Sequence, residues 1–122
     1  MAVIKRLECV SIFTRDIDAS ARFYAALGLM ESWRIDRPQG GATVTLIGLK
    51  FPDATSSELV LSNNADVPFT EIELLCDDVR STHADLAPRG DIQWIREPFA
   101  TESGHVAVME APDGNVFVLV GA

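Results

Sequence analysis

The chain has 122 residues, 48% of them hydrophobic and 23% charged, which is typical of one globular domain and excludes a disordered chain. Acidic residues outnumber basic ones 18 to 10, and the net charge of −8 argues against nucleic acid or an anionic membrane as partner. Charged residues interrupt every apolar stretch, the start lacks the apolar core of a signal peptide, and two cysteines make no disulfide framework. We therefore expect a cytoplasmic protein.

The first half of the chain opens with a short apolar strand at 10–13. Asp16 follows and is a good helix cap, because a short carboxylate accepts a bond from the first amides of a helix. Apolar residues then recur at helical spacing until a glycine ends the helix (Ile17, Ala21, Tyr24 and Gly28). The turn residues at 39–41 and apolar runs at 43–46 and 58–61 predict further strands.

The second half repeats this pattern. Residues 71–90 match 9–28 at an offset of 62, so that Asp78 falls on Asp16 and Gly90 on Gly28. The runs at 105–108 and 118–120 match 43–46 and 58–60, and the turn signal at 112–115 precedes the last strand. Each half predicts a strand, a helix and three strands. We expect a single domain, 1–122, with module one at about 5–62 and module two at about 69–121.

A duplicated βαβββ module with these motifs resembles the vicinal oxygen chelate (VOC) superfamily, which includes glyoxalases, extradiol dioxygenases and bleomycin resistance proteins. The resemblance rests on VSIFTRDIDASARFYAALGL at 10–29, ELVL at 58–61, residues 71–79 and APDGNVFVLV at 111–120. It implies an α+β fold in which two tandem modules curl their mixed sheets around a cavity, with the helices on the outer faces. It also implies a homodimer.

The resemblance further implies a metal site with one ligand from each of four strands, which fall here on Cys9, Glu58, Glu71 and Val118. The family usually places His, Glu, His and Glu there, so only Glu58 is the usual residue. Val118 binds no metal, and a thiolate beside two carboxylates is an unusual set for a catalytic divalent ion. We expect no metal cofactor. The alternative is a divalent Zn, Ni, Mn or Fe ion held by an altered ligand set.

Strand alternation predicts which side chains line the cavity, because residues two apart share a face. The expected lining comprises Cys9, Ser11, Phe13, Glu58, Val60, Glu71, Glu73 and Val118. Trp33 and Trp94 follow the two helices and are ligand-stacking candidates, although core packing is the commoner role of tryptophan. If the protein is an enzyme, the catalytic candidates are Glu71, Glu73 and His105. His83 lies on the apolar face of its helix, and we expect it to be packed.

An acidic cavity with three glutamates favours a cationic ligand, which would relieve their repulsion, unless the carboxylates face solvent. The leading hypothesis is therefore a metal-free small-molecule-binding protein, similar to bleomycin resistance proteins, that takes a cationic or aromatic ligand. The alternative is a metal-dependent lyase, isomerase or dioxygenase of the glyoxalase type. A metal-free enzyme with Glu71 or Glu73 as base is a third possibility.

Overall fold

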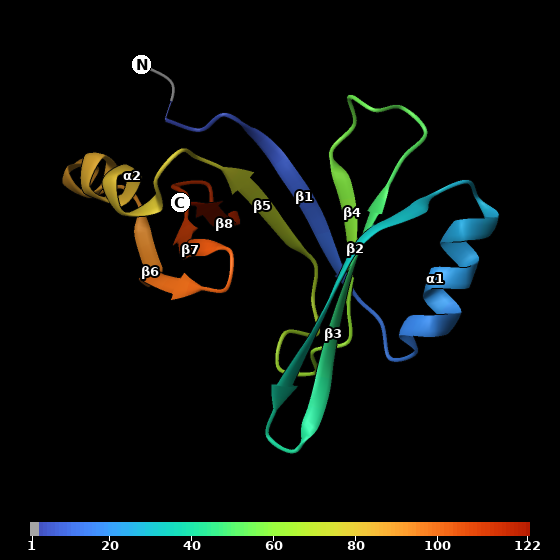
Figure 1. Ribbon diagram of the computed structural model, residues 1–122. Coiled ribbons are helices and arrows are strands. Elements are labelled where there is room, and N and C mark those ends of the chain that lie inside the picture. The colour runs from blue at the N-terminus through green and yellow to red at the C-terminus, as the bar shows by residue number, and fades with distance from the viewer. Residues whose placement is uncertain (1–2) are drawn as a thin grey trace. The chain divides into compact units, whose positions relative to one another are not determined.

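The computed structural model describes residues 3–122, which form two compact units (Figure 1). The first unit is Cys9–Thr70, and the second is Glu71–Ala122 together with the N-terminal segment up to Glu8. Residues 5–8, which the sequence analysis assigned to module one, group with the second unit. The reason is local, because the Lys5 amide donates to the Leu75 carbonyl oxygen at 2.7 Å and Ile4 packs in the core of that unit.

The first unit has the βαβββ order that the sequence predicts. Its elements are β1 (Arg6–Phe13, of which the part from Cys9 onward belongs to this unit), α1 (Ile17–Ala26), β2 (Met30–Gln39), β3 (Ala42–Lys50) and β4 (Glu58–Ser62). The strands lie in the order β2-β3-β4-β1. Neighbours are antiparallel except for β4 and β1, which run parallel, so the sheet is mixed.

The second unit repeats the same order with different side chains. It contains β5 (Glu71–Leu75), α2 (Val79–Leu86), a short 3-10 turn η1 (Ala87–Arg89), β6 (Gln93–Thr101), β7 (Gly104–Glu110) and β8 (Val116–Gly121). The strand order β5-β8-β7-β6 corresponds to β1-β4-β3-β2 of the first unit, and β5 and β8 are again the parallel pair. The α+β fold built from two βαβββ modules is thereby confirmed.

Both helices begin at the aspartates that the sequence analysis chose as caps. Asp16 Oδ1 accepts a bond from the Ala19 amide at 3.0 Å, and Asp78 Oδ1 accepts one from the Ser81 amide at 2.9 Å. Gly28 follows α1 with φ 105°, a left-handed conformation that favours glycine. These local signals therefore set the start of each helix and the end of α1.

Each sheet has one face under its helix and one face turned away from it. Each core consists of residues that are at most 9% exposed. The core under α1 contains Ile17, Ile47, Leu49 and Leu61. The core under α2 contains Cys76, Val79, Ala107, Met109 and Leu119. Ile12, Leu74 and Phe117 pack against these cores, as the alternation predicts. Within residues 3–122, none of the helices has the length and apolar character that crossing a bilayer requires.

Candidate functional site

The face of each sheet opposite its helix, here called the open face, carries the side chains that the sequence analysis assigned to a cavity. In the first unit Cys9 lies opposite Glu58, and Ser11 lies opposite Val60. Cys9, Ser11 and Val60 are at most 6% exposed, whereas Glu58 is half-buried. Phe13 continues the same face of β1 and is also half-buried.

The carboxylate of Glu58 is held by two donors from β2. Trp33 Nε1 donates to Glu58 Oε1 at 2.8 Å, and Ser32 Oγ donates to Glu58 Oε2 at 2.8 Å. The Ser32 hydroxyl also lies 3.2 Å from the Gly48 carbonyl oxygen. A carboxylate with one bond on each oxygen has a defined orientation, and Glu58 is therefore a fixed anion on the open face.

Two features of the chain allow this arrangement. The register of β2 against β3 shifts between Glu31 and Trp33, so Ser32 is an extra residue, a β-bulge. Consecutive strand residues normally point to opposite faces, but the bulge lets the side chains of Ser32 and Trp33 reach the same carboxylate. Trp33 lies opposite Gly48, and a Cβ atom at Gly48 would overlap the indole ring. The glycine thus leaves the space in which the ring lies across the sheet, a use of strand glycine that the sequence analysis missed.

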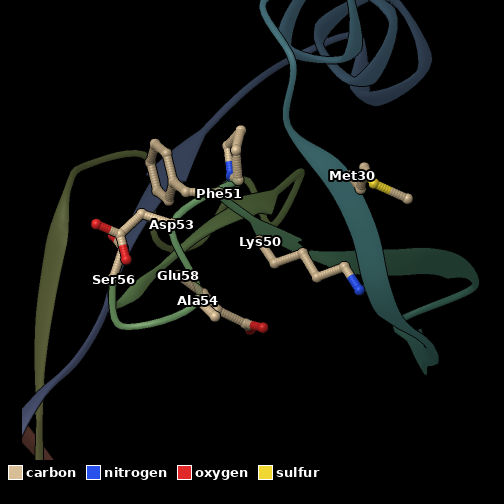
Figure 2. Close-up of a pocket in the computed structure, with 8 residues that line it drawn as sticks. Met30, Lys50, Phe51, Asp53, Ala54, Ser56 and Glu58 are labelled. Carbon is tan, nitrogen blue, oxygen red and sulfur yellow. The ribbon is translucent and has the colours of Figure 1, made fainter.

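Glu58 also lines a pocket of about 430 Å³ between the start of β2 and the loop that joins β3 to β4. Its walls come from Met30, Lys50, Phe51, Pro52, Asp53, Ala54, Ser56 and Glu58. In Figure 2 the Lys50 side chain extends toward β2, on which Met30 lies, while the Phe51 and Asp53 side chains extend in the opposite direction. The loop residues carry no motif, and the sequence analysis did not single them out.

The open face of the second unit is built on the same ladder. Glu73 lies opposite Val118, Val118 opposite Val108, and Val108 opposite Arg96. The Arg96 guanidinium lies 4.2 Å from the centre of the Phe99 ring, a cation–π contact at the β6 edge. This face therefore runs from a carboxylate through two valines to an arginine.

Glu71, at the start of β5, is half-buried. Burial raises the pKa of its carboxyl group above the ordinary value, because removal from water disfavours the charged form. A raised pKa is common for carboxyl groups with a proton-transfer role, and it supports Glu71 as a catalytic candidate.

Trp94 and His105 lie on the helix side of the second sheet. Trp94 packs in the core under α2, with its ring 4.4 Å from that of His83, so the core position and not the ligand-stacking position is the one observed. His105 shares its face of β7 with Ala107 and Met109, both in that core. Neither residue lies on the open face, because the side-chain alternation of β6 and β7 turns both toward α2.

The strand registers show which of the four positions expected to hold metal ligands lie opposite one another. Cys9 pairs with Glu58, but Val118 pairs with Glu73 and not with Glu71. The repeat in the sequence, which matches Cys9 to Glu71 and Glu58 to Val118, is therefore two residues out of step with the ladders. Sequence offsets cannot reveal this difference, because only hydrogen-bonded pairing defines it.

The residues at these positions do not fit a catalytic metal. The first unit supplies a thiol and a carboxylate, whereas the second supplies one carboxylate and the hydrocarbon side chain of Val118. In the part of the chain from 3 to 122, no three His, Cys, Asp or Glu side chains are grouped in a way that could hold a metal ion. Three protein ligands are the usual minimum for a catalytic zinc or related ion.

Comparison with known proteins agrees with this architecture. A curated Bacillus subtilis (strain 168) protein, the uncharacterized protein YwbC, is 29% identical over 117 residues, which cover 90% of this chain and 92% of that one. The structure of Streptomyces coelicolor methylmalonyl-CoA epimerase with 2-nitronate-propionyl-CoA has a TM-score of 0.73 at 21% identity, covering 98% of each chain. A methylmalonyl-CoA epimerase with methylmalonyl-CoA and NH4+ has a TM-score of 0.73 at 20% identity, covering 98% of this chain and 95% of that one.

At these identities the likeness to the epimerase structures concerns the fold. The model of the Glyoxalase/Bleomycin resistance protein/Dioxygenase superfamily matches residues 6–119, which is almost the whole chain. The protein therefore belongs to the Glyoxalase/Bleomycin resistance protein/Dioxygenase superfamily.

Proposed function

We propose that this protein binds a small cationic or aromatic molecule without a metal ion, in the way that the sequence analysis expected from its resemblance to bleomycin resistance proteins. The supporting observation is the oriented carboxylate of Glu58, which two protein donors hold in place. Each carboxylate oxygen has a second lone pair, so the group can still accept a bond from a ligand. The net charge of −8 adds a long-range attraction for cations.

Isothermal titration of the purified protein with bleomycin, a cationic aromatic glycopeptide, and with related glycopeptides tests the proposal. We expect heat of binding when the protein and the glycopeptide have both been freed of metal ions, and we expect this heat to fall when Glu58 is changed to Gln. The absence of heat with every glycopeptide would contradict the drug-binding function.

The metal-dependent alternative is tested on the same material, purified without chelator. Stoichiometric Zn, Ni, Mn or Fe that is lost in Glu58→Gln would favour the lyase, isomerase or dioxygenase function instead. The donor set described above argues against this outcome, and the metal content decides between the two.

A second candidate function is proton transfer at a carbon acid, favoured by the raised pKa of Glu71 and by the fold shared with methylmalonyl-CoA epimerases. The expected observation is exchange of the α-proton of methylmalonyl-CoA in deuterated water, followed by NMR. Glu71→Gln should abolish the exchange, and the exposed residue Glu97 provides a control variant, Glu97→Gln, of equal charge. No exchange by the unaltered protein would exclude this substrate.

The homodimer remains a prediction from the resemblance. Sedimentation equilibrium measures it directly, and a monomer at micromolar concentration would contradict it.

A further inference from the structure

We infer that the pocket beside Glu58 is a subsite for a protonated amine carried on an apolar group, and that Trp33 is the residue that positions the Glu58 carboxylate for it. The inference rests on the proposed function, because it names the chemical group that the first unit recognises. It goes beyond that function by assigning the recognition to one pocket and to one tryptophan.

Trp33 and Ser32 restrict the carboxylate before any ligand arrives. A glutamate side chain normally loses rotamer freedom when it binds a cation, which weakens the binding. Here the indole N–H and the Ser32 hydroxyl each hold one oxygen at 2.8 Å. The half-buried carboxylate therefore presents its remaining lone pairs without a further ordering cost, as a preorganised acceptor does.

The charges that line the pocket favour a cation. Glu58 and Asp53 contribute two carboxylates, and Lys50 contributes one ammonium group. Asp53 Oδ1 accepts bonds from the Thr55 hydroxyl at 2.6 Å and from the Thr55 amide at 2.9 Å, and these bonds lower the pKa of Asp53. Both bonds stabilise the ionised form of Asp53. With two carboxyl groups and one amine among its lining residues, the pocket has an excess of acidic groups.

Apart from Ser56, the rest of the pocket wall is apolar. Met30 is 62% exposed and Phe51 is 37% exposed, and Pro52 lies between Phe51 and the acidic loop residue Asp53. A bare inorganic cation would leave these side chains in water, whereas an amine on an aromatic or aliphatic group would cover them. The phenyl ring of Phe51 also offers a face for a cationic group.

Three probes of similar shape and different charge test the subsite: 2-phenylethylamine, 2-phenylethanol and 3-phenylpropionate. Two-dimensional ¹H–¹⁵N NMR follows the backbone amides of Gly48 and Phe51 and the indole N–H of Trp33, whose signal is identified by its loss in Trp33→Phe. We expect saturable shifts with the amine, binding several-fold weaker with the alcohol, and no shift with the carboxylate. Equal binding of amine and alcohol would overturn the inference.

Variants then separate positioning from packing. Glu58→Gln keeps the shape of the side chain and should weaken amine binding by about tenfold, the usual scale of one charge-assisted bond. Trp33→Phe keeps an aromatic ring without the N–H donor, and we expect weaker binding of the amine with unchanged binding of the alcohol. A merely structural role of Trp33 would weaken both probes alike and would overturn its assignment as a positioning residue.

Two further variants should not weaken amine binding. Lys50→Gln removes the cation from the wall and should strengthen amine binding. Glu31→Gln removes the same charge as Glu58→Gln from the same end of the first unit, outside the pocket lining, and should leave the amine affinity unchanged. Weaker amine binding in Lys50→Gln, or an equal loss in Glu31→Gln, would contradict recognition by the pocket.

The glycopeptide titration keeps failure of the subsite distinct from failure of the proposed function. If the unaltered protein binds bleomycin but shows no amine preference among the three probes, the subsite is wrong and the function stands. If none of the glycopeptides gives heat, the drug-binding function fails whatever the small probes do.

Discussion

The two units place different side chains on the same four-stranded ladder. Across the first unit the row reads Ser11, Val60, Gly48 and Trp33, and across the second it reads Glu73, Val118, Val108 and Arg96. Where the first unit has a glycine, a tryptophan ring lies across the strand and reaches Glu58. Where the second unit has Val108, the side chain at the sheet edge is Arg96, which packs over Phe99. The two rows thus differ beside the edge strand, where Gly48 leaves room for the Trp33 ring and Val108 carries a side chain.

The largest effects should come from the two cores, which the comparison treats as equivalent. Leu61 in the first unit and Leu119 in the second are fully buried, so Leu61→Ala and Leu119→Ala should each lower the free energy of unfolding by about 2–5 kcal/mol. Urea denaturation followed by circular dichroism measures both. A large loss in one variant and none in the other would break the equivalence of the two cores.

A methyl group at Gly48 should remove the feature that distinguishes the first unit. Gly48→Ala places a Cβ atom inside the indole of Trp33, and overpacking of this kind costs about 1–3 kcal/mol. The indole must move away from Glu58, so we expect a red-shifted tryptophan emission and loss of the amine preference. Val108→Ala is the matched variant of the second unit and should change neither the emission nor the amine preference. An unchanged emission in Gly48→Ala would show that Trp33 does not depend on the gap.

The raised pKa of Glu71 predicts a pH dependence with a definite sign. Between the ordinary pKa and the raised value, the folded state binds more protons than the unfolded state, so stability falls as pH rises through that range. Glu71→Gln should therefore be more stable than the unaltered protein at neutral pH, with no gain at acid pH below the ordinary value. Urea titrations at several pH values measure the difference, and Glu97→Gln controls for net charge. A gain that does not vary with pH would contradict the role of burial.

The smallest effects should come from the helix caps, in which the two units are alike. Asp16→Ala removes the acceptor for the Ala19 amide and should cost about 1 kcal/mol. Asp78→Ala removes the acceptor for the Ser81 amide and should also destabilise the protein. The unfolding temperatures of both variants measure this loss of stability. Asp113→Ala, which alters a turn and no helix, is the control that shows whether the loss comes from the helix caps.

Features that depend on residues close together in the chain could be predicted from the sequence, and features that depend on the pairing of distant strands could not. The caps at Asp16 and Asp78, the glycine after α1 and the helix-facing positions of β1 and β8 were predicted, because each depends on residues close in the chain. The placement of Glu58 and Val60 on the open face followed from the same alternation. Ser32 and Gly48 were missed, because their arrangement depends on the pairing of β2 with β3, including a register shift that no local pattern indicates. The loop after β3 was missed because its residues carry no motif.

The amino-acid sequence by itself determined the repeated βαβββ order, the helix starts and the family. These features depend on periodicity, capping and turn chemistry, all of which act over a few residues. Only the tertiary structure decided that Trp33 and Ser32 hold Glu58, that Trp94 and His105 lie on the side of α2, and that Val118 pairs with Glu73. These features depend on which strands pair and in which register, a choice made by hydrogen bonds between residues far apart in the chain.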